Sequence, residues 1–202
     1  MLLADESFSE RVEATVTELE QRTDAEIVVV VAARSGEYRD LAFGAATAAT
    51  FALLVVLDAV PFAIHPWAVV ADLAIAWPLT AWVATSDRVT RWLLSATRAD
   101  DAVLRAAAAA FYEEGVHATP NRTGVLVYVS TVEGRVKLVP DIGLEAHIPP
   151  GRFGEATRQF AHDDLDHFLA GLRALGDVLA ERVPHTQASD AVDLPNTPRI
   201  RP

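Results

Sequence analysis

The chain has 202 residues, no cysteine and a formal net charge of −11 at pH 7. The lack of cysteine excludes disulfides, thiol catalysis and thiolate metal sites. Because so acidic a surface repels phosphate groups, we expect no nucleic-acid partner and no attraction to anionic lipid through bulk electrostatics.

The first part of the chain predicts a helix and then a strand. Apolar residues that share one helical face recur at steps of four and three, namely Phe8, Val12, Val16 and Leu19. Glu26–Ala32 follows as a continuous run of mostly β-branched residues. Such a run is typical of a central strand that is covered on both faces.

The next segment, Leu41–Ser86, contains no Lys, Arg or Glu and only two Asp. Two apolar runs within it, Leu41–Val60 and Trp67–Ala84, each have about the length that crosses a bilayer as a helix. Pro61 and Pro66 lie between the runs and disfavour helix in the residues that precede them. We therefore predict a transmembrane helical hairpin over 41–86. The alternative is a hairpin buried in a soluble core, because both runs are rich in alanine.

Arginines near the outer ends of the hairpin predict its orientation. Three precede the first run and three follow the second, whereas the turn between the runs has none. Because excess Arg and Lys stay on the cytoplasmic side, we expect a multi-pass protein of the bacterial inner membrane with both termini in the cytoplasm. The arginines counted are Arg22, Arg34, Arg39, Arg88, Arg91 and Arg98.

After the hairpin, a helix is predicted over Asp100–His117, followed by two strands, Thr123–Ser130 and Arg135–Val139. The short turn between these strands contains a glycine and predicts that they pair antiparallel. If the first strand of the chain pairs in parallel with Thr123–Ser130, the helix before it supplies the crossover. Two further helical segments are expected within Arg152–Val183.

This order of elements predicts one discontinuous α/β domain, formed by residues 1–40 and 87–183. The segment before the hairpin is too small to hold a core alone, so the hairpin over 41–86 is an insertion and not a linker between two domains. Residues 184–202 are rich in proline and lack hydrophobic periodicity. We expect them to form a flexible tail.

Three segments, in this order, resemble the TPM domain family: Thr23–Val31, Arg122–Ser130 and Arg135–Glu145. The resemblance covers about Phe8–Val183, with the hairpin inserted after the first strand, as in some bacterial members. It implies an α/β sandwich with a central mixed sheet, interrupted here by the transmembrane hairpin. Acid phosphatase activity has been attributed to a plant member of the family, and acidic clusters that bind divalent metals to several members.

Two motifs of the family can be compared residue by residue. The family often has Asp-Asn-Gly before its second strand, whereas this chain has Asn121-Arg122-Thr123-Gly124, so an expected carboxylate is replaced by a basic and a hydroxyl residue. The Gly-Leu-Glu element of the family is present at Gly143–Glu145.

Asp141 and Glu145 follow the end of a predicted strand, where two carboxylates can converge on a hard cation such as Ca2+ or Mg2+. We predict a metal site at these two residues. The alternative is that Asp141 is a turn residue and Glu145 is solvated. Asp24 precedes a neighbouring strand and is left out of the site, because it could lie at the opposite end of the sheet.

Two other groups of polar residues are candidates for ligands. The first group comprises His162, Asp163, Asp164, Asp166 and His167. On a regular helix, these residues would form two carboxylate–imidazole pairs that can bind a metal, or else the polar side of an amphipathic helix. The second group borders the hairpin turn and either binds a proton or cation or sets the pairing of the two helices. It comprises Asp58, His65 and Asp72.

The motifs of the best-defined hydrolases and nucleotide-binding proteins do not occur in the chain. We therefore expect a binding, assembly or regulatory module that acts at the cytoplasmic membrane face on another membrane protein. The alternative is a divalent-metal-dependent phosphatase in which Asp141 and Glu145 hold the cation.

Overall fold

The computed structural model describes residues 7–59, 61, 65–186 and 194–201. The chain divides into two compact units. The first comprises residues 1–35 and 99–202, and the second comprises residues 36–98. The second unit is thus inserted between two segments of the first.

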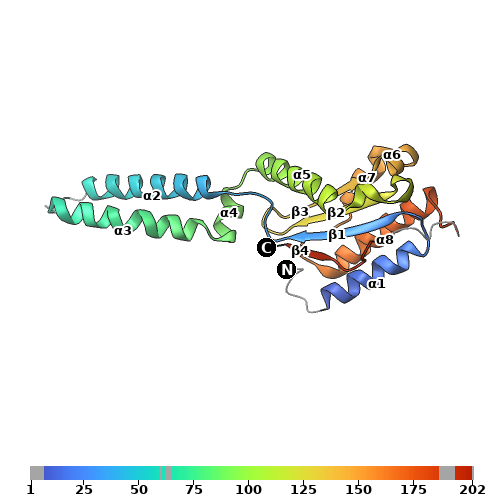
Figure 1. Ribbon diagram of the computed structural model, residues 1–202. Helices are drawn as coiled ribbons and strands as arrows, with labels where there is room; N and C mark the ends of the chain where they lie inside the picture. Colours follow the sequence, from blue (N-terminus) through green and yellow to red (C-terminus); the bar gives the residue numbers. More distant parts are fainter. Residues whose placement is uncertain (1–6, 60, 62–64, 187–193, 202) are drawn as a thin grey trace. The chain divides into compact units, whose positions relative to one another are not determined.

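A four-stranded mixed sheet with the strand order β3-β2-β1-β4 forms the centre of the first unit (Figure 1). β1 (Glu26–Ala32) pairs in parallel with β2 (Gly124–Ser130), in a register that places Ile27 opposite Val125. β2 pairs antiparallel with β3 (Arg135–Pro140). The predicted central strand, the parallel pair and the antiparallel pair are confirmed.

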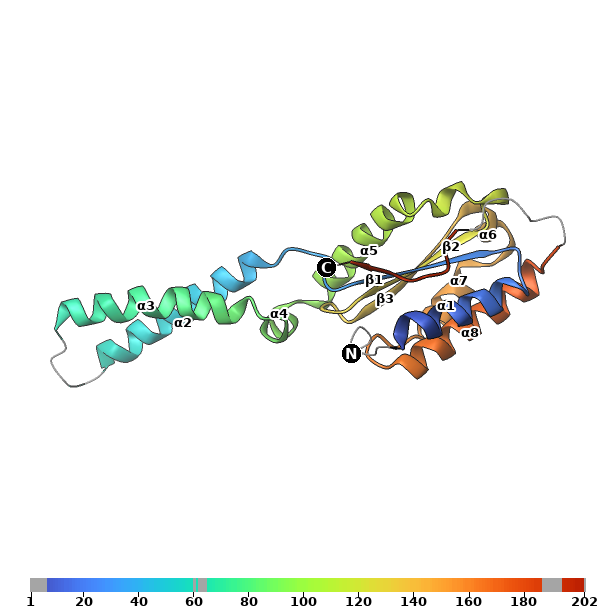
Figure 2. The ribbon, with the colours of Figure 1, turned by 60° about the horizontal axis from the view of Figure 1, so that its bottom comes forward.

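Helices cover both faces of this sheet. α1 (Phe8–Glu20) and α8 (Leu165–Arg182) lie side by side on one face, and α5 (Ala96–Glu113) lies on the other (Figures 1 and 2). Side chains of β1 alternate between two hydrophobic cores, so that Val29 packs with α1 and α8 while Val30 packs with α5. This two-sided burial explains the continuous apolar run of β1 and confirms the α/β fold class.

Short elements connect the larger ones. The crossover from β1 to β2 contains the second unit and α5, and then two 3₁₀ turns, η2 (Val116–Ala118) and η3 (Pro120–Arg122). Between β3 and α8 lie α6 (Ile142–His147) and α7 (Pro150–Thr157). α6 is not predicted from the sequence because six residues are too few to display a helical period.

The second unit contains a helical hairpin in which α2 (Arg39–Ala59) and α3 (Pro66–Ala84) run side by side (Figure 1). The ring of Phe43 stacks on the ring of Trp77, with 5.7 Å between the ring centroids. The indole N–H of Trp77 donates to Thr47 Oγ1 at 3.3 Å. Trp77 therefore joins α3 to α2.

α2 and α3 are long and apolar enough to cross a membrane. Their most apolar windows have mean hydropathies of 1.9 and 1.5, and 11% of each window is buried. A helix in a soluble core would be mostly buried, whereas here large apolar side chains such as Phe51 and Ile75 are each 66% exposed. α4 (Asp87–Leu93) follows α3 and packs against both helices of the hairpin.

An ion pair joins the two ends of the second unit. Arg98 donates from Nη1 and Nη2 to the two carboxylate oxygens of Asp40, at 2.6 and 2.8 Å. The same guanidinium lies 5.4 Å from the ring centroid of Tyr38. Because a bidentate pair fixes both partners in orientation, it holds the start of α2 beside the residue where the chain leaves the unit.

The structure places a strand within the segment 184–202, for which the sequence predicts a flexible tail. β4 (Arg199–Arg201) pairs in parallel with Val30–Ala32 of β1. The expectation is therefore corrected for these residues, which cover part of the free edge of β1. The reason for the difference is that three residues in the pattern Arg-Ile-Arg carry no periodic signal, and their strand exists only through its neighbour.

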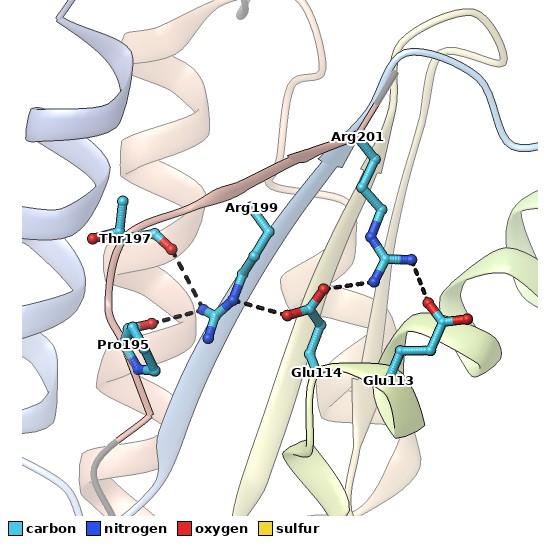
Figure 3. A network of polar contacts seen from close by, with 6 residues as sticks. All are labelled: Glu113, Glu114, Pro195, Thr197, Arg199 and Arg201. Carbon is cyan, nitrogen blue, oxygen red and sulfur yellow. Dashed lines mark hydrogen bonds and ion pairs between the residues drawn. The ribbon is translucent and has the colours of Figure 1, made fainter.

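Two arginines attach β4 to the end of α5, as Figure 3 shows. Arg199 Nε donates to Glu114 at 3.0 Å, and Arg201 Nη2 donates to the other oxygen of Glu114 at 2.5 Å. Arg201 Nη1 also donates to Glu113 at 2.7 Å. Glu114 therefore joins both arginines, and its side chain is only 18% exposed, against 59% for Glu113.

Replacing Glu114 with Gln is expected to lower the free energy of unfolding by about 1–3 kcal/mol, because Arg199 loses its charged partner and Arg201 keeps only the exposed Glu113. Glu113→Gln is the matched control and is expected to cost less than about 1 kcal/mol, since this carboxylate is exposed. Denaturant unfolding of the purified protein measures both values, and amide hydrogen exchange reports on β4. Equal losses of unfolding free energy in the two variants would contradict the conclusion that Glu114 is the main attachment of β4 to α5.

Candidate functional site

Polar side chains gather at the end of the sheet where β1 and β2 begin. Because β3 runs antiparallel to β2, the residues after β3 lie beside the residues before β2. This register brings Asp141 to Arg122. Asp24 precedes β1 at the same end, and its carbonyl oxygen accepts a hydrogen bond from Thr123 Oγ1 at 3.0 Å. The placement of Asp24 at the opposite end is therefore corrected.

Asp141 is buried, with 3% of the residue exposed, and its carboxylate is fully engaged. Arg122 donates to both oxygens, from Nε at 2.6 Å and from Nη2 at 2.8 Å. The backbone N–H of Ile142 donates to the same carboxylate at 2.7 Å, so Asp141 is also the N-cap of α6. The hydrogen bond to Asp141 raises the pKa of Arg122, which stays charged.

The contact between Arg122 and Asp141 depends on a close approach of backbones. Asn121 and Arg122 both have a φ of 57°, in the left-handed region that few residues other than glycine adopt. A Cβ atom on Gly143 would overlap with the carbonyl oxygens of Asn121 and Arg122. Glycine at 143 is therefore required for α6 to lie against this strained turn.

The two residues predicted to hold a metal differ in their surroundings. Glu145 follows Asp141 by one turn on α6 and is exposed to solvent. The turn role of Asp141, weighed as the alternative, is present in its capping of α6. In the part of the chain that the structure describes, no group of three or more His, Asp or Glu is placed to hold a metal ion. The metal site at Asp141 and Glu145 stays a prediction.

The carboxylate of Asp24 is bound within the fold. Thr186 donates to it from its backbone N–H at 2.8 Å and from its hydroxyl, and His185 Nδ1 lies at 3.1 Å. Burial alone would raise the pKa of Asp24, but the hydrogen bonds from Thr186 and the charge of His185 outweigh burial and lower the pKa. Asp24 therefore attaches the segment after α8 to the start of β1.

The polar cluster at 162–167 does not have the predicted geometry. α8 begins only after Asp164, so His162 and Asp163 precede the helix and do not share its faces with Asp166 and His167. Asp164 caps α8 and accepts a hydrogen bond from the backbone N–H of His167 at 2.8 Å. Asp166 pairs with an arginine of α1. The described contacts of this cluster are structural.

The three residues that border the hairpin turn differ in their contacts. His65 is the N-cap of α3, and its Nδ1 accepts a hydrogen bond from the N–H of Trp67 at 3.4 Å. Asp58 and Asp72 are exposed on α2 and α3. His65 thus begins α3, and the two alternatives for these three residues stay predictions.

Sequence reasoning missed a buried polar network at the other end of the sheet, where β1 and β2 end. Ser35 Oγ donates to Ser130 Oγ at 2.6 Å and lies 3.1 Å from the hydroxyl of Tyr128. Glu133, 5% exposed, accepts hydrogen bonds from the hydroxyl of Ser130 and from the N–H of Ser35 at 3.0 Å. Burial raises the pKa of Tyr128. The network fixes Ser35, the last residue of the first unit before the hairpin.

No protein-family model and no curated protein sequence matches this chain. Among solved structures, the chain is similar to the NMR structure of the BA42 protein from the psychrophilic bacterium Bizionia argentinensis, with a TM-score of 0.55. The two sequences are 14% identical, and the alignment covers 95% of this chain and 91% of that chain. At this identity the similarity shows a related fold.

Replacing Gly143 with Ala is expected to lower the free energy of unfolding by about 1–3 kcal/mol, because the backbone at Asn121 and Arg122 must move and weaken the pair with Asp141. Gly154→Ala in α7 is the matched control, since no atom lies within 4 Å of the added methyl group. This control is expected to be neutral or to stabilise the protein by up to about 1 kcal/mol. Denaturant unfolding distinguishes the two outcomes, and a neutral Gly143→Ala variant would refute the close approach.

Proposed function

We propose that this chain is a membrane-anchored TPM-domain protein whose α/β unit serves as a binding, assembly or regulatory module for another membrane protein. The supporting observation is the outward apolar surface of α2 and α3, which have the length and hydropathy of membrane-spanning helices and are little buried. In water, this surface would be a large exposed apolar patch. A bilayer removes that exposure.

The proposed location is the bacterial inner membrane, with both termini in the cytoplasm. The arginines of the second unit support this orientation, because Arg39 begins α2 while Arg88, Arg91 and Arg98 follow α3. The turn between the two helices has no basic residue apart from His65. Excess arginine at one end of a hairpin favours the cytoplasmic side for that end.

We rank binding above catalysis because the carboxylate predicted to hold a metal already has a cation beside it. Both oxygens of Asp141 accept hydrogen bonds from Arg122, and Glu145 lies in solvent. A divalent ion would have to displace the guanidinium and leave it near a second cation. The phosphatase alternative, with Ca2+ or Mg2+ at Asp141 and Glu145, therefore ranks second.

Topology reporters test the membrane proposal. Alkaline phosphatase and a fluorescent protein are each fused in the turn at Ile64 and after Pro202 in the full chain. We expect phosphatase activity from the turn fusion and fluorescence from the C-terminal fusion, with the protein resistant to extraction by alkaline carbonate. Fluorescence from the turn fusion, or release by carbonate, would contradict the proposed hairpin.

Hydrolysis of a generic phosphomonoester by the purified protein tests the alternative. We expect no turnover that depends on calcium, magnesium or manganese. Glu145→Gln is the informative variant because its side chain is exposed, whereas Asp141→Asn would also remove the partner of Arg122 and weaken the cap of α6. Metal-stimulated turnover that is lost in Glu145→Gln would establish the phosphatase and overturn the ranking.

A further inference from the structure

A groove of about 360 Å³ lies at the end of α3 and is lined by Trp82, Val83, Thr85 and Ser86. Its apolar part is accessible, since Trp82 is 74% exposed and Val83 is 49% exposed. Its polar part consists of two hydroxyl-bearing residues. Ser86 is the N-cap of α4, but its side chain makes no capping hydrogen bond. The groove thus combines apolar surface with hydrogen-bonding groups, as the boundary between acyl chains and headgroups requires.

α4 follows this groove directly in the chain and carries basic and aromatic side chains. Thr90 is buried, with 3% of the residue exposed, and α4 packs against α2 and α3. Arg88 and Trp92 are four residues apart and share one face, and Arg91 lies next to them; both arginines are exposed. Trp92 is 84% exposed. Tryptophan favours the headgroup level of a bilayer, and arginine favours an anionic membrane surface.

The acidity of the whole chain does not oppose an anionic ligand at this position. Residues 36–98 contain four arginines and five acidic residues, so they carry only −1 of the net charge of −11. Two of the five acids, Asp58 and Asp72, lie toward the hairpin turn and away from α4 along the helices. The end of the unit that holds α4 therefore has four arginines and three acidic residues; Arg98 is paired with Asp40, and Asp87 and Arg91 also have interaction partners.

We infer that the junction of α3 and α4 is a binding site for the headgroup of an anionic phospholipid. Arg88 and Arg91 bind the phosphate, while Trp82 and Trp92 lie at the level of the ester groups. A bilayer lipid is favoured over a protein partner because the groove lies at the end of α3, a helix long and apolar enough to cross a membrane, on which Leu79 is 54% exposed. The inference rests on the membrane insertion proposed above and adds a lipid preference to it.

The test uses the full-length protein in nanodiscs of equimolar phosphatidylcholine and phosphatidylglycerol, and native mass spectrometry measures the lipid of each class that the protein retains. The variant Arg88→Gln/Arg91→Gln is expected to lower the ratio of retained phosphatidylglycerol to phosphatidylcholine by about fivefold per arginine, which corresponds to about 1 kcal/mol for each basic residue at an anionic surface. Arg158→Gln/Arg173→Gln removes the same charge from exposed positions of the first unit and is expected to leave the ratio unchanged.

Each other outcome has a defined meaning. Wild-type protein that does not enter nanodiscs contradicts the proposed membrane insertion itself. Protein that enters them but shows the same ratio in both double variants overturns the lipid site and leaves insertion intact. A change of oligomeric mass in Arg88→Gln/Arg91→Gln without a change of the lipid ratio identifies a second copy of the chain as the occupant. Displacement of phosphatidylglycerol by excess inorganic phosphate identifies a site for free phosphate. The change of oligomeric mass and the displacement by phosphate each overturn the inference.

Discussion

The parallel pairing of β1 with β2 is the constraint on which the rest of the structure depends. Parallel neighbours cannot be joined by a tight turn, so a long connection must leave the end of one strand and return to the start of the other. Here that connection contains both the apolar hairpin and α5, the helix that covers one face of the sheet. The hairpin thus lengthens a crossover that the sheet requires in any case. β1 and β2, the strands that this connection joins, are buried almost along their whole length.

The two ends of the sheet each hold a buried carboxylate, and each accepts hydrogen bonds from at least one residue that lies outside its own loop. At one end, the charge of Asp141 is balanced by Arg122 across an antiparallel register. At the other, Glu133 accepts hydrogen bonds from Ser35 and Ser130, which come from the ends of β1 and β2. Buried carboxylates of this kind are costly without their partners and specify one arrangement when the partners are present. In this protein the two carboxylates determine which loops meet at each end of the sheet.

Continuous apolar runs in the sequence predict β1 and the two hairpin helices, because a strand buried on both faces and a helix long and apolar enough to cross a membrane each need uninterrupted apolar residues. The short elements α6 and β4 have no continuous apolar run, since each is stabilised by residues that lie far from it in the sequence. Arg122 was recognised only as a departure from a family motif, and its contact with Asp141 follows from a strand register. The two carboxylate–imidazole pairs considered for the cluster at 162–167 do not form, because Asp164 caps α8 and the helical period does not extend to the residues before it.

The insertion of the hairpin between paired strands also imposes an order on biosynthesis. Glu26 pairs with Gly124, so β1 leaves the ribosome well before its parallel partner has been made. During that interval the most apolar strand of the chain has an open edge, which favours mispairing and aggregation. The apolar helices emerge in the same interval, before the sheet can close. Under the proposed membrane insertion, targeting of the nascent chain precedes folding of the α/β unit, and delayed insertion prolongs the period in which β1 is unprotected.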